Sequence, residues 1–348
     1  MTSRPKPWLW VGVAAAVVVA LVVGVSVGAV AIPPHLALAR AFDWLPGVSA
    51  TSLTSNETAI VDHLRLPRVV LGALVGFTLA LCGCAYQGVF RNPLADPYLL
   101  GAASGAGLGA TLAIGWGVGA AAGSQSAQWS AVPLFAFAGA LGAVAVTYAV
   151  GATGDRRRSP ASLLLAGVAV GSMATAAQTF FQQRYAETIR EVYAWILGRL
   201  STSGWTEVQM MLPYAAVATV VILLNRRTLD LLAVGEDEAA TLGLNVERSR
   251  LIIVAAASLG TAAAVAVSGL IGFVGIIVPH ALRLTGVSSY RWLLGLSALA
   301  GSGFLVLADV LARQLLSPAE IPIGVVTALV GAPFFVLLLR TRRPAAVV

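Results

Sequence analysis

Residues 69–90 read VVLGALVGFTLALCGCAYQGVF, a run of 22 residues without a charged side chain. A helix of about 20 apolar residues spans the hydrocarbon core of a bilayer, so this run predicts a transmembrane helix. Nine further apolar runs occupy residues 8–32, 99–118, 131–150, 162–181, 206–224, 251–267, 270–284, 292–312 and 323–339. They are too continuous for the alternating strands of a barrel, so the expected fold is all-α with about ten transmembrane helices.

The composition of the whole chain also indicates a membrane protein. Of its 348 residues, 58% are hydrophobic and 11% are charged, and the mean hydropathy is +0.86. Soluble domains carry about 25% charged residues, so a soluble class is excluded. We expect one polytopic domain over residues 1–348, with its longest cytoplasmic loop at about residues 225–250.

The basic residues predict the orientation of the chain. With the N-terminus inside, ten spans place 15 of the 22 Lys and Arg residues in cytoplasmic loops, which leaves 7 outside. Cytoplasmic loops of membrane proteins are enriched in these residues, so both termini are expected in the cytoplasm. Because the basic residues follow the loops and form no single face, nucleic acid is not an expected partner.

Few residues suggest catalysis or metal binding. The single lysine, Lys6, lies in the N-terminal tail, so the chain lacks the lysine of a nucleotide-binding P-loop and cannot be an ATPase itself. Cys82 and Cys84 are two positions apart and would point to different faces of a helix. The three histidines are scattered along the sequence at His35, His63 and His280. We therefore expect no catalytic residue, no metal site and no cofactor.

Ionisable residues are nearly absent from the middle of the spans. Asp309 is close to the outer end of the ninth span, and Arg313 follows at i+4, a spacing that suits an ion pair. Ion-coupled transporters and membrane-embedded enzymes usually carry buried carboxylates or reactive clusters in their spans. Both classes are thus disfavoured, and a separate protein is expected to supply the energy for transport.

Glycines mark two kinds of helix contact. One stripe on the third span comprises Gly101, Gly105 and Gly109. Small residues at every fourth position let helix backbones approach closely, so this stripe predicts ordinary helix packing. The short span at 270–284 contains Gly272 and Gly275 and continues to Pro279, a composition typical of broken transporter helices. We interpret these three residues as a candidate pivot.

The loop at 225–250 contains a predicted surface helix. Gly235 precedes the three acids of residues 236–238, which would complement the positive end of a helix dipole, and Gly243 supplies a stop signal. Ala239, Ala240 and Leu242 add a small apolar face, and Asn245 is placed to cap the next span. Two interpretations remain open here, a solvated loop helix or a docking surface for a partner.

Two arginines, Arg65 and Arg68, stand at the outer start of the second span. Arginines at a membrane boundary often anchor a helix by extending their charge into water. Arginine is also well suited to bind carboxylates of a soluble partner. The residues alone leave both roles open.

Several motifs together resemble the permease subunits of the ABC importers for iron chelates, haem and cobalamin, called the FecCD or BtuC type. The motifs are RLPR at 65–68, FRNPLADP at 90–97 with Leu100-Gly101, LLLAG at 163–167, Gly235-Glu236 with Ala240 and Leu242-Gly243, GFVGIIVPH at 272–280 with Arg283, Ala308-Asp309 with Arg313, and EIPIG at 320–324. They follow the family's order from about residue 60 to residue 335.

This resemblance implies a set of partners and sites. The partners are two cytoplasmic ABC ATPase subunits, an extracytoplasmic substrate-binding protein and a second permease subunit, either identical or closely related. The implied sites are docking of the binding protein at Arg65, Arg68 and Arg313, coupling to the ATPase at Gly235, Glu236, Ala240, Leu242 and Gly243, and a cytoplasmic gate at Asn92 and Leu94. A second gate position departs from the pattern, because Pro160 and Ala161 replace small hydroxyl residues.

The expected function is that of a non-enzymatic pore subunit, which is a multi-pass protein of the bacterial cytoplasmic membrane, in contact with the lipid bilayer. Its substrate is expected to be a bulky iron chelate, either a ferric siderophore or haem. A cobalamin importer is the alternative, and an ion-coupled secondary transporter is the alternative of another class. An apolar path of Gly, Ala, Val and Leu does not distinguish these chelates.

Overall fold

The computed structural model describes residues 6–28, 30, 32–43, 53–118, 125–151, 160–200 and 204–341. Seven helices in these ranges are long and apolar enough to cross a membrane: α1 (Pro7–Ser26), α4 (Leu66–Val89), α6 (Gln125–Gly151), α7 (Pro160–Arg184), α9 (Thr206–Leu224), α12 (Val246–Ser268) and α14 (Tyr290–Gln314). Three further apolar helices are α5 (Ala102–Gly115), α13 (Val274–Leu284) and α15 (Ile323–Thr341). A helix therefore lies at each of the ten predicted spans.

Shorter elements connect these helices. They are α2 (Pro34–Ala41), α3 (Ser55–Ile60), the π-helical turn η1 (Val61–Arg65), the 3-10 turns η2 (Pro97–Leu100) and η4 (Ala186–Thr188), α8 (Ile189–Ile196), α10 (Arg226–Val234) and α11 (Glu236–Thr241). Within the described ranges, the one β-type contact is a single bridge between Leu316 and Ala319. The predicted all-α class is confirmed.

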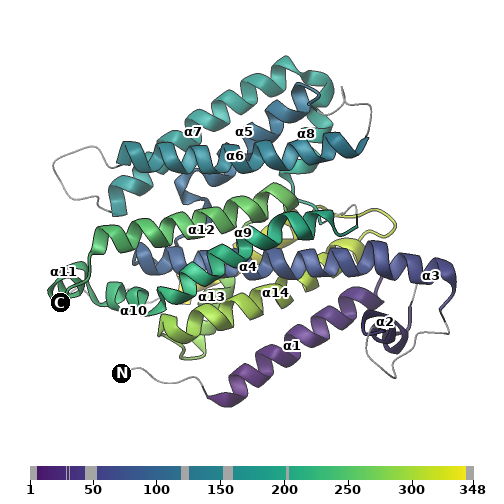
Figure 1. Cartoon of the computed structure of the whole chain (residues 1–348), viewed down its shortest axis with the longest axis horizontal. Coiled ribbons are helices and arrows are strands. Elements are labelled where there is room, and N and C mark those ends of the chain that lie inside the picture. The colour runs from purple at the N-terminus through teal and green to yellow at the C-terminus, as the bar shows by residue number, and fades with distance from the viewer. Residues whose placement is uncertain are drawn as a thin grey trace.

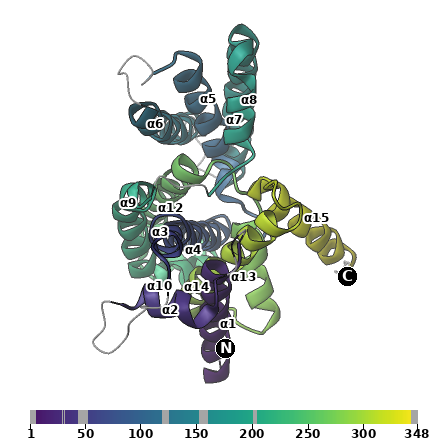
Figure 2. The same cartoon turned by 90° about the vertical axis from the view of Figure 1, so that its right-hand side faces the viewer.

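The helices pack in three layers (Figure 1). One layer contains α5, α6, α7 and α8, the middle layer contains α4, α9, α12, α13 and α14, and α1 packs on the far side against α14. Figure 2 shows that α15 leaves the middle layer and projects sideways. Helices α10 and α11 lie at one end of the molecule, hereafter the α11 end, and α2 and α3 lie at the opposite end, the α3 end (Figure 1).

Helix α4 is the centre of the bundle because glycines let its neighbours touch its backbone. A Cβ atom on Gly76 would lie 2.2 Å from the carbonyl oxygen of Gly301 in α14. A Cβ on Gly83 would lie 2.3 Å from the carbonyl oxygen of Gly275 in α13. Such distances leave no room for any side chain, so α4, α13 and α14 pack backbone to backbone.

The glycine stripe on the third span is confirmed at two of its three positions. Cβ atoms on Gly105 and Gly109 would lie 2.3 and 2.1 Å from backbone oxygens of α6, so these glycines do form a close helix contact. Gly101 instead precedes α5 and adopts a φ of 83°, in the left-handed region that favours glycine. Its predicted place within the helical stripe was wrong, because the chain turns there.

The eighth span begins later than predicted. Both Gly269 and Phe273 adopt a φ of 70°, which interrupts the helix between α12 and α13. Helix α13 therefore starts at Val274 instead of residue 270 and has 11 residues. Its length of about 16 Å is roughly half of the hydrocarbon thickness, so α13 is a partial span.

The second span is much longer than a membrane requires. Residues Ser55–Val89 form a continuous helical segment of 35 residues that comprises α3, η1 and α4. Its length is about 52 Å, against roughly 30 Å of hydrocarbon, so part of it extends beyond the bilayer. Pro67 has no N–H to donate, and the wider turn η1, in which Leu66 N–H bonds to Val61 O, lies directly before it.

Candidate functional site

Arg68, at the start of α4, binds two carboxylates that are distant in sequence. Its Nε and Nη2 donate to Asp309 Oδ1 at 3.1 and 2.9 Å, and its Nη1 and Nη2 donate to Glu320 Oε1 and Oε2, both at 2.9 Å. The side chain of Asp309, in α14, is 4% exposed, whereas that of Glu320, between α14 and α15, is 52% exposed. Arg68 thus has one buried and one accessible acidic partner.

Arg65, in η1, is buried and caps the end of α1. Its guanidinium donates to the carbonyl oxygens of Val25 at 2.9 Å and Ser26 at 2.8 Å, and also to that of Val30. The last carbonyls of a helix lack intrahelical partners and carry partial negative charge, so a cation stabilises them. With 6% of its surface exposed, Arg65 presents little of itself to solvent.

Arg313, in α14, contacts the same end of α1. It donates to Val27 O at 2.8 Å and to Gly24 O at 3.1 Å. Its Nε also lies 3.0 Å from Asp309 Oδ2, which confirms the ion pair predicted from their spacing. Arg65 and Arg313 together hold α1 against the α3 end of the bundle.

The three arginines predicted to dock a binding protein therefore meet in one cluster at the α3 end. They line a cavity of about 350 Å³, together with Glu320 and parts of the loops before α2 and α15. Their docking role stays a prediction. Most of their donors are engaged within the chain, and only the pair of Arg68 with Glu320 is accessible.

A second charged cluster ties α2 to η1 beside this cavity. The guanidinium of Arg40 donates to both carboxylate oxygens of Asp62, with the shortest contact at 2.6 Å, and also contacts Asp43. The hydrogen bond to Asp62 raises the pKa of Arg40 above its ordinary value. This cluster fixes α2 on the α3 end of the molecule.

At the opposite end, the predicted surface helix is present as α11. Gly235 precedes it, its first turn carries Glu236 with the next two acids, and Gly243 follows with a φ of 86°. Asn245 caps α12 through a 3.0 Å bond from Arg248 N, as its position predicts. The acidic start and the glycine stop of this helix are thus confirmed.

The surface of α11 has an apolar and a tethered side. Ala240 and Leu242 are exposed, and Leu242 is 71% exposed. Ala239 was wrongly predicted to share this face, because it is 1% exposed and packs into the core of the bundle. On the other side, the carboxylate of Glu236 pairs with the buried Arg250 of α12. The exposed side can receive a partner, and the ion pair attaches α11 to a long helix of the bundle.

The loop between α4 and α5 contains the first predicted gate position. Arg91, two residues after the end of α4, has a φ of 50°, and the side chain of Asn92 accepts a 3.0 Å hydrogen bond from Leu94 N. The second position, Pro160 and Ala161, opens α7, and Ala161 is exposed. The preceding residues 152–159, including the arginines 156–158 used to predict orientation, and the side chain of Pro160 lie outside what the structure describes.

The α4–α5 loop also contacts the break between α12 and α13. The hydroxyl of Tyr98 donates to Ile271 O at 3.0 Å, and it accepts a 3.2 Å hydrogen bond from Ile271 N. Gly272 lies in the break, whereas Gly275 and Pro279 lie within α13. One predicted pivot residue thus lies in the junction and the other two follow it, and Tyr98 links this junction to the predicted gate loop.

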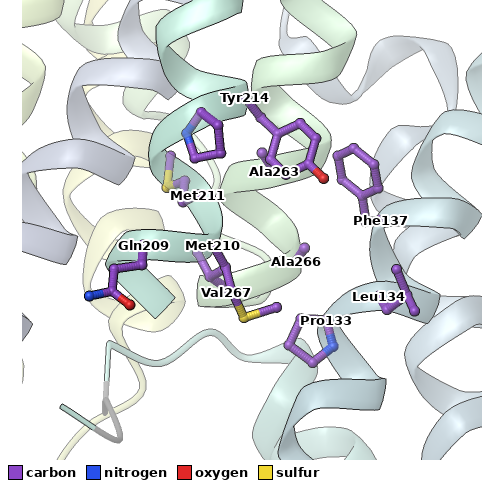
Figure 3. A pocket seen from close by; sticks show the side chains of 11 residues that line it. Pro133, Leu134, Phe137, Gln209, Met210, Met211, Tyr214, Ala263, Ala266 and Val267 are labelled. Carbon is purple, nitrogen blue, oxygen red and sulfur yellow. The ribbon is translucent and has the colours of Figure 1, made fainter. Parts of the chain in front are cut away.

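A cavity of about 270 Å³ between α6, α9 and α12 is mainly apolar (Figure 3). The rings of Phe137 and Tyr214 pack at one side of it, with 4.9 Å between their centroids, and Gln209 lies at another. No group of three or more His, Cys, Asp or Glu in the described ranges is arranged to hold a metal ion. The lining offers van der Waals contact and no reactive group.

The chain matches the FecCD transport family over residues 16–341. The protein belongs to the FecCD transport family. It is 44% identical over 313 residues to the cobalamin import system permease protein BtuC of Halobacterium salinarum, in an alignment that covers 90% of this chain and 80% of the relative. It is 37% identical over 292 residues to the hemin transport system permease protein HmuU of Yersinia pestis, in an alignment that covers 81% of this chain and 83% of the relative.

A solved structure has the same architecture. It is described as an inward-facing conformation of a metal-chelate type ABC transporter, and it matches with a TM-score of 0.80 and 28% identity over 96% of this chain and 99% of its own. This FecCD protein is therefore a multi-pass ABC importer permease with a BtuC-like fold. ATP hydrolysis in such transporters belongs to a separate subunit.

Several residues of these sites were not predicted. Glu320 was noted only within its motif, Arg250 only as the last residue of the predicted loop, and Tyr98 and helix α10 not at all. In the segment at 226–234 (RRTLDLLAV), apolar residues recur at helical spacing and polar residues lie between them. This amphipathic pattern could have predicted α10. For Tyr98 and Glu320, whose partners are 173 and 252 residues away, no local signal exists.

Proposed function

We propose that this FecCD permease moves a bulky iron chelate, a ferric siderophore or haem, from an extracytoplasmic binding protein into the cytoplasm. Two cytoplasmic ABC ATPase subunits drive the transport, and both termini of the permease are cytoplasmic. The observation that carries the proposal is the family match over residues 16–341. The separation of the arginine cluster and of α11 at opposite ends supports two partners on opposite sides of the membrane (Figure 1).

The ATPase binds the exposed side of α11, where Ala240 and Leu242 face solvent between Gly235 and Gly243. Movement of α11 reaches α12 through the ion pair of Glu236 with Arg250. A helix of 23 residues such as α12 transmits a displacement along its length with little bending. The helix break at its far end, with Gly272, is the place where this displacement becomes a change of angle.

The gate follows from the same chain of contacts. Tyr98 connects the break to the α4–α5 loop, so a movement of the break displaces Asn92 and Leu94. Gly275 and Pro279 in α13 adjoin the break on its other side. Closure is completed by the start of α7, with Pro160 and Ala161. A second copy of the permease, or a close paralogue, contributes the other half of the path.

Exposed apolar helix faces support this assembly. Leu165, Met173 and Phe180 on α7 and Leu329 and Leu337 on α15 are all exposed. Such faces require either lipid or another subunit against them. Helix α15 projects away from the bundle, which makes it suited to embrace a second subunit (Figure 2).

At the α3 end, the arginine cluster receives the binding protein. Arg68 provides a guanidinium that a carboxylate of the partner can bind with two parallel hydrogen bonds. Arg65 and Arg313 contribute positive charge and hold the surrounding helices in place. Opposite charges on the two proteins would accelerate their association and orient the complex.

Cobalamin is the second candidate substrate, favoured by the 44% identity to a cobalamin import permease. The test uses the complete transporter, with its ATPase and binding protein, reconstituted into liposomes. ATP-dependent uptake of a radiolabelled ferric siderophore or haem, without uptake of radiolabelled cobalamin, is the expected result. Uptake of cobalamin alone would replace the iron chelate, and uptake driven by an ion gradient without ATP would overturn the importer mechanism.

A further inference from the structure

The accessible edge of Arg68 is already occupied by a carboxylate of the same chain. Nη1 and Nη2 of Arg68 bind the two oxygens of Glu320 in parallel, each at 2.9 Å. This two-point geometry is the one by which an arginine recognises a carboxylate of another protein. Glu320 therefore stands where an acidic side chain of a docking partner would bind.

Apart from the bond of Arg65 to the exposed Val30, the other donors of the arginine cluster are committed to buried or half-buried groups. Arg65 and Arg313 bind the terminal carbonyls of α1, and the inner edge of Arg68 binds Asp309, which is 4% exposed. Removing any of these would leave a buried charge or carbonyl without a partner, which is costly. Glu320 is different, because its carboxylate can turn into water when another anion replaces it.

The backbone of the loop lets Glu320 release Arg68 without unfolding. Ile321 N donates to Ala312 O at 2.9 Å, and Ala319 N donates to Leu316 O at 2.9 Å, so the main chain on both sides is held independently of the carboxylate. The cavity of about 350 Å³ beside it gives an incoming side chain room. An exposed ion pair contributes little to stability, because water and salt compete with it.

We propose that Glu320 is an intramolecular competitor for the docking site, so that binding of the partner requires a carboxylate of the partner to displace Glu320 from Arg68. This inference rests on the proposed docking at the α3 end. The partner it fits is an acidic surface of a soluble binding protein. Exchange of one carboxylate for another keeps Arg68 paired throughout, and it keeps the affinity of the undocked permease for other anions low.

The charges of the cluster indicate the direction of the effect. Arg65, Arg68 and Arg313 face two acids, Asp309 and Glu320, within the contacts described. Replacing Glu320 by Gln removes one of these acids and leaves the accessible edge of Arg68 free for the partner. We expect E320Q to bind the partner about 2-fold to 5-fold more tightly, the range that loss of one exposed competing ion pair allows.

The experiment measures the affinity of the complete transporter, in lipid nanodiscs without ATP, for its purified substrate-binding protein. D43N is the matched control, because it removes an acid at the same end that pairs with Arg40 and has no bond to Arg68. We expect tighter binding for E320Q, no change for D43N, and a smaller gain for E320Q as salt rises. Equal thermal stability of E320Q and wild type would show that the loop is intact.

R68K separates failure of this inference from failure of the docking proposal. Lysine keeps a charge beside Asp309 but loses the two-point geometry, so the variant should fold and bind the partner more weakly. If R68K binds the partner more weakly and E320Q binds it no more tightly than wild type, the competitor role is overturned and docking at Arg68 stands. Unchanged binding by R68K would overturn docking at Arg68, and the competitor role with it.

Discussion

Replacing Arg65 with Met should loosen α1 from the bundle. Arg65 is 6% exposed and donates to three carbonyl oxygens, of which those of Val25 and Ser26 are buried. A charge-assisted hydrogen bond contributes about 1.5 kcal/mol or more, so the two buried ones give about 3 kcal/mol. Met has a similar length and no donor, so the variant loses these bonds without leaving a large void.

The assay uses the two cysteines of the protein. Cys82 and Cys84 have no exposed surface in the fold, so a thiol-reactive fluorescent dye reports unfolding without added labels. A loss of about 3 kcal/mol corresponds to a fall in Tm of about 4 °C for a protein of this size. The control is Arg40→Met, which removes a partly exposed pair at the same end and should cost less than about 1 kcal/mol.

Equal Tm values for the Arg65 and Arg40 variants would refute the reasoning, because they would mean that the carbonyls of α1 find water or other partners without cost. A fall in Tm with unchanged affinity for the binding protein would assign Arg65 to the support of α1 alone.

Three further predictions concern the α11 end, the orientation and the junction. Ala240→Trp should reduce co-purification of the ATPase by severalfold, since a small residue in a packed contact cannot grow without steric cost, whereas Thr241→Ser should not. In intact cells, a membrane-impermeant maleimide should label Asn56→Cys in α3 but not Thr241→Cys in α11, and the reverse pattern would invert the proposed topology. Tyr98→Phe removes both hydrogen bonds to Ile271 and should lower stability by about 1 kcal/mol and slow ATP-driven uptake, while ATPase binding stays unchanged. Wild-type uptake by this variant would separate the junction from gating.

The transmembrane helices were predictable because hydrophobicity is a local property. Any run of about 20 apolar residues must form backbone hydrogen bonds within itself in a bilayer. The start of α13 was not predictable, because Phe273 adopts a positive φ that nothing in its side chain favours. Neighbouring segments fix the backbone of this break through contacts that are remote in sequence, with Trp195 against Gly269 and Tyr98 bonded to Ile271.

The candidate sites divide in the same way. The pair of Asp309 with Arg313 and the cap at Asn245 depend on residues three or four positions apart, and both were predicted. Arg65 binds backbone carbonyls up to 40 residues away, and every residue type has such a carbonyl. The sequence indicated that arginines matter at the α3 end, but their actual partners depend on how α1, α4 and α14 pack.

The contacts of α4 without intervening side chains constrain how the transporter moves. Where the backbone of Gly83 meets that of Gly275, and that of Gly76 meets that of Gly301, one helix cannot roll over the other, because no flexible side chain lies between them to change rotamer. Helices α4, α13 and α14 should therefore travel as one block through every state of the cycle. Distances between spin labels placed within this block should stay constant during ATP turnover. Distances from the block to labels on α5, α7 or α15 should change as the transporter moves between its states.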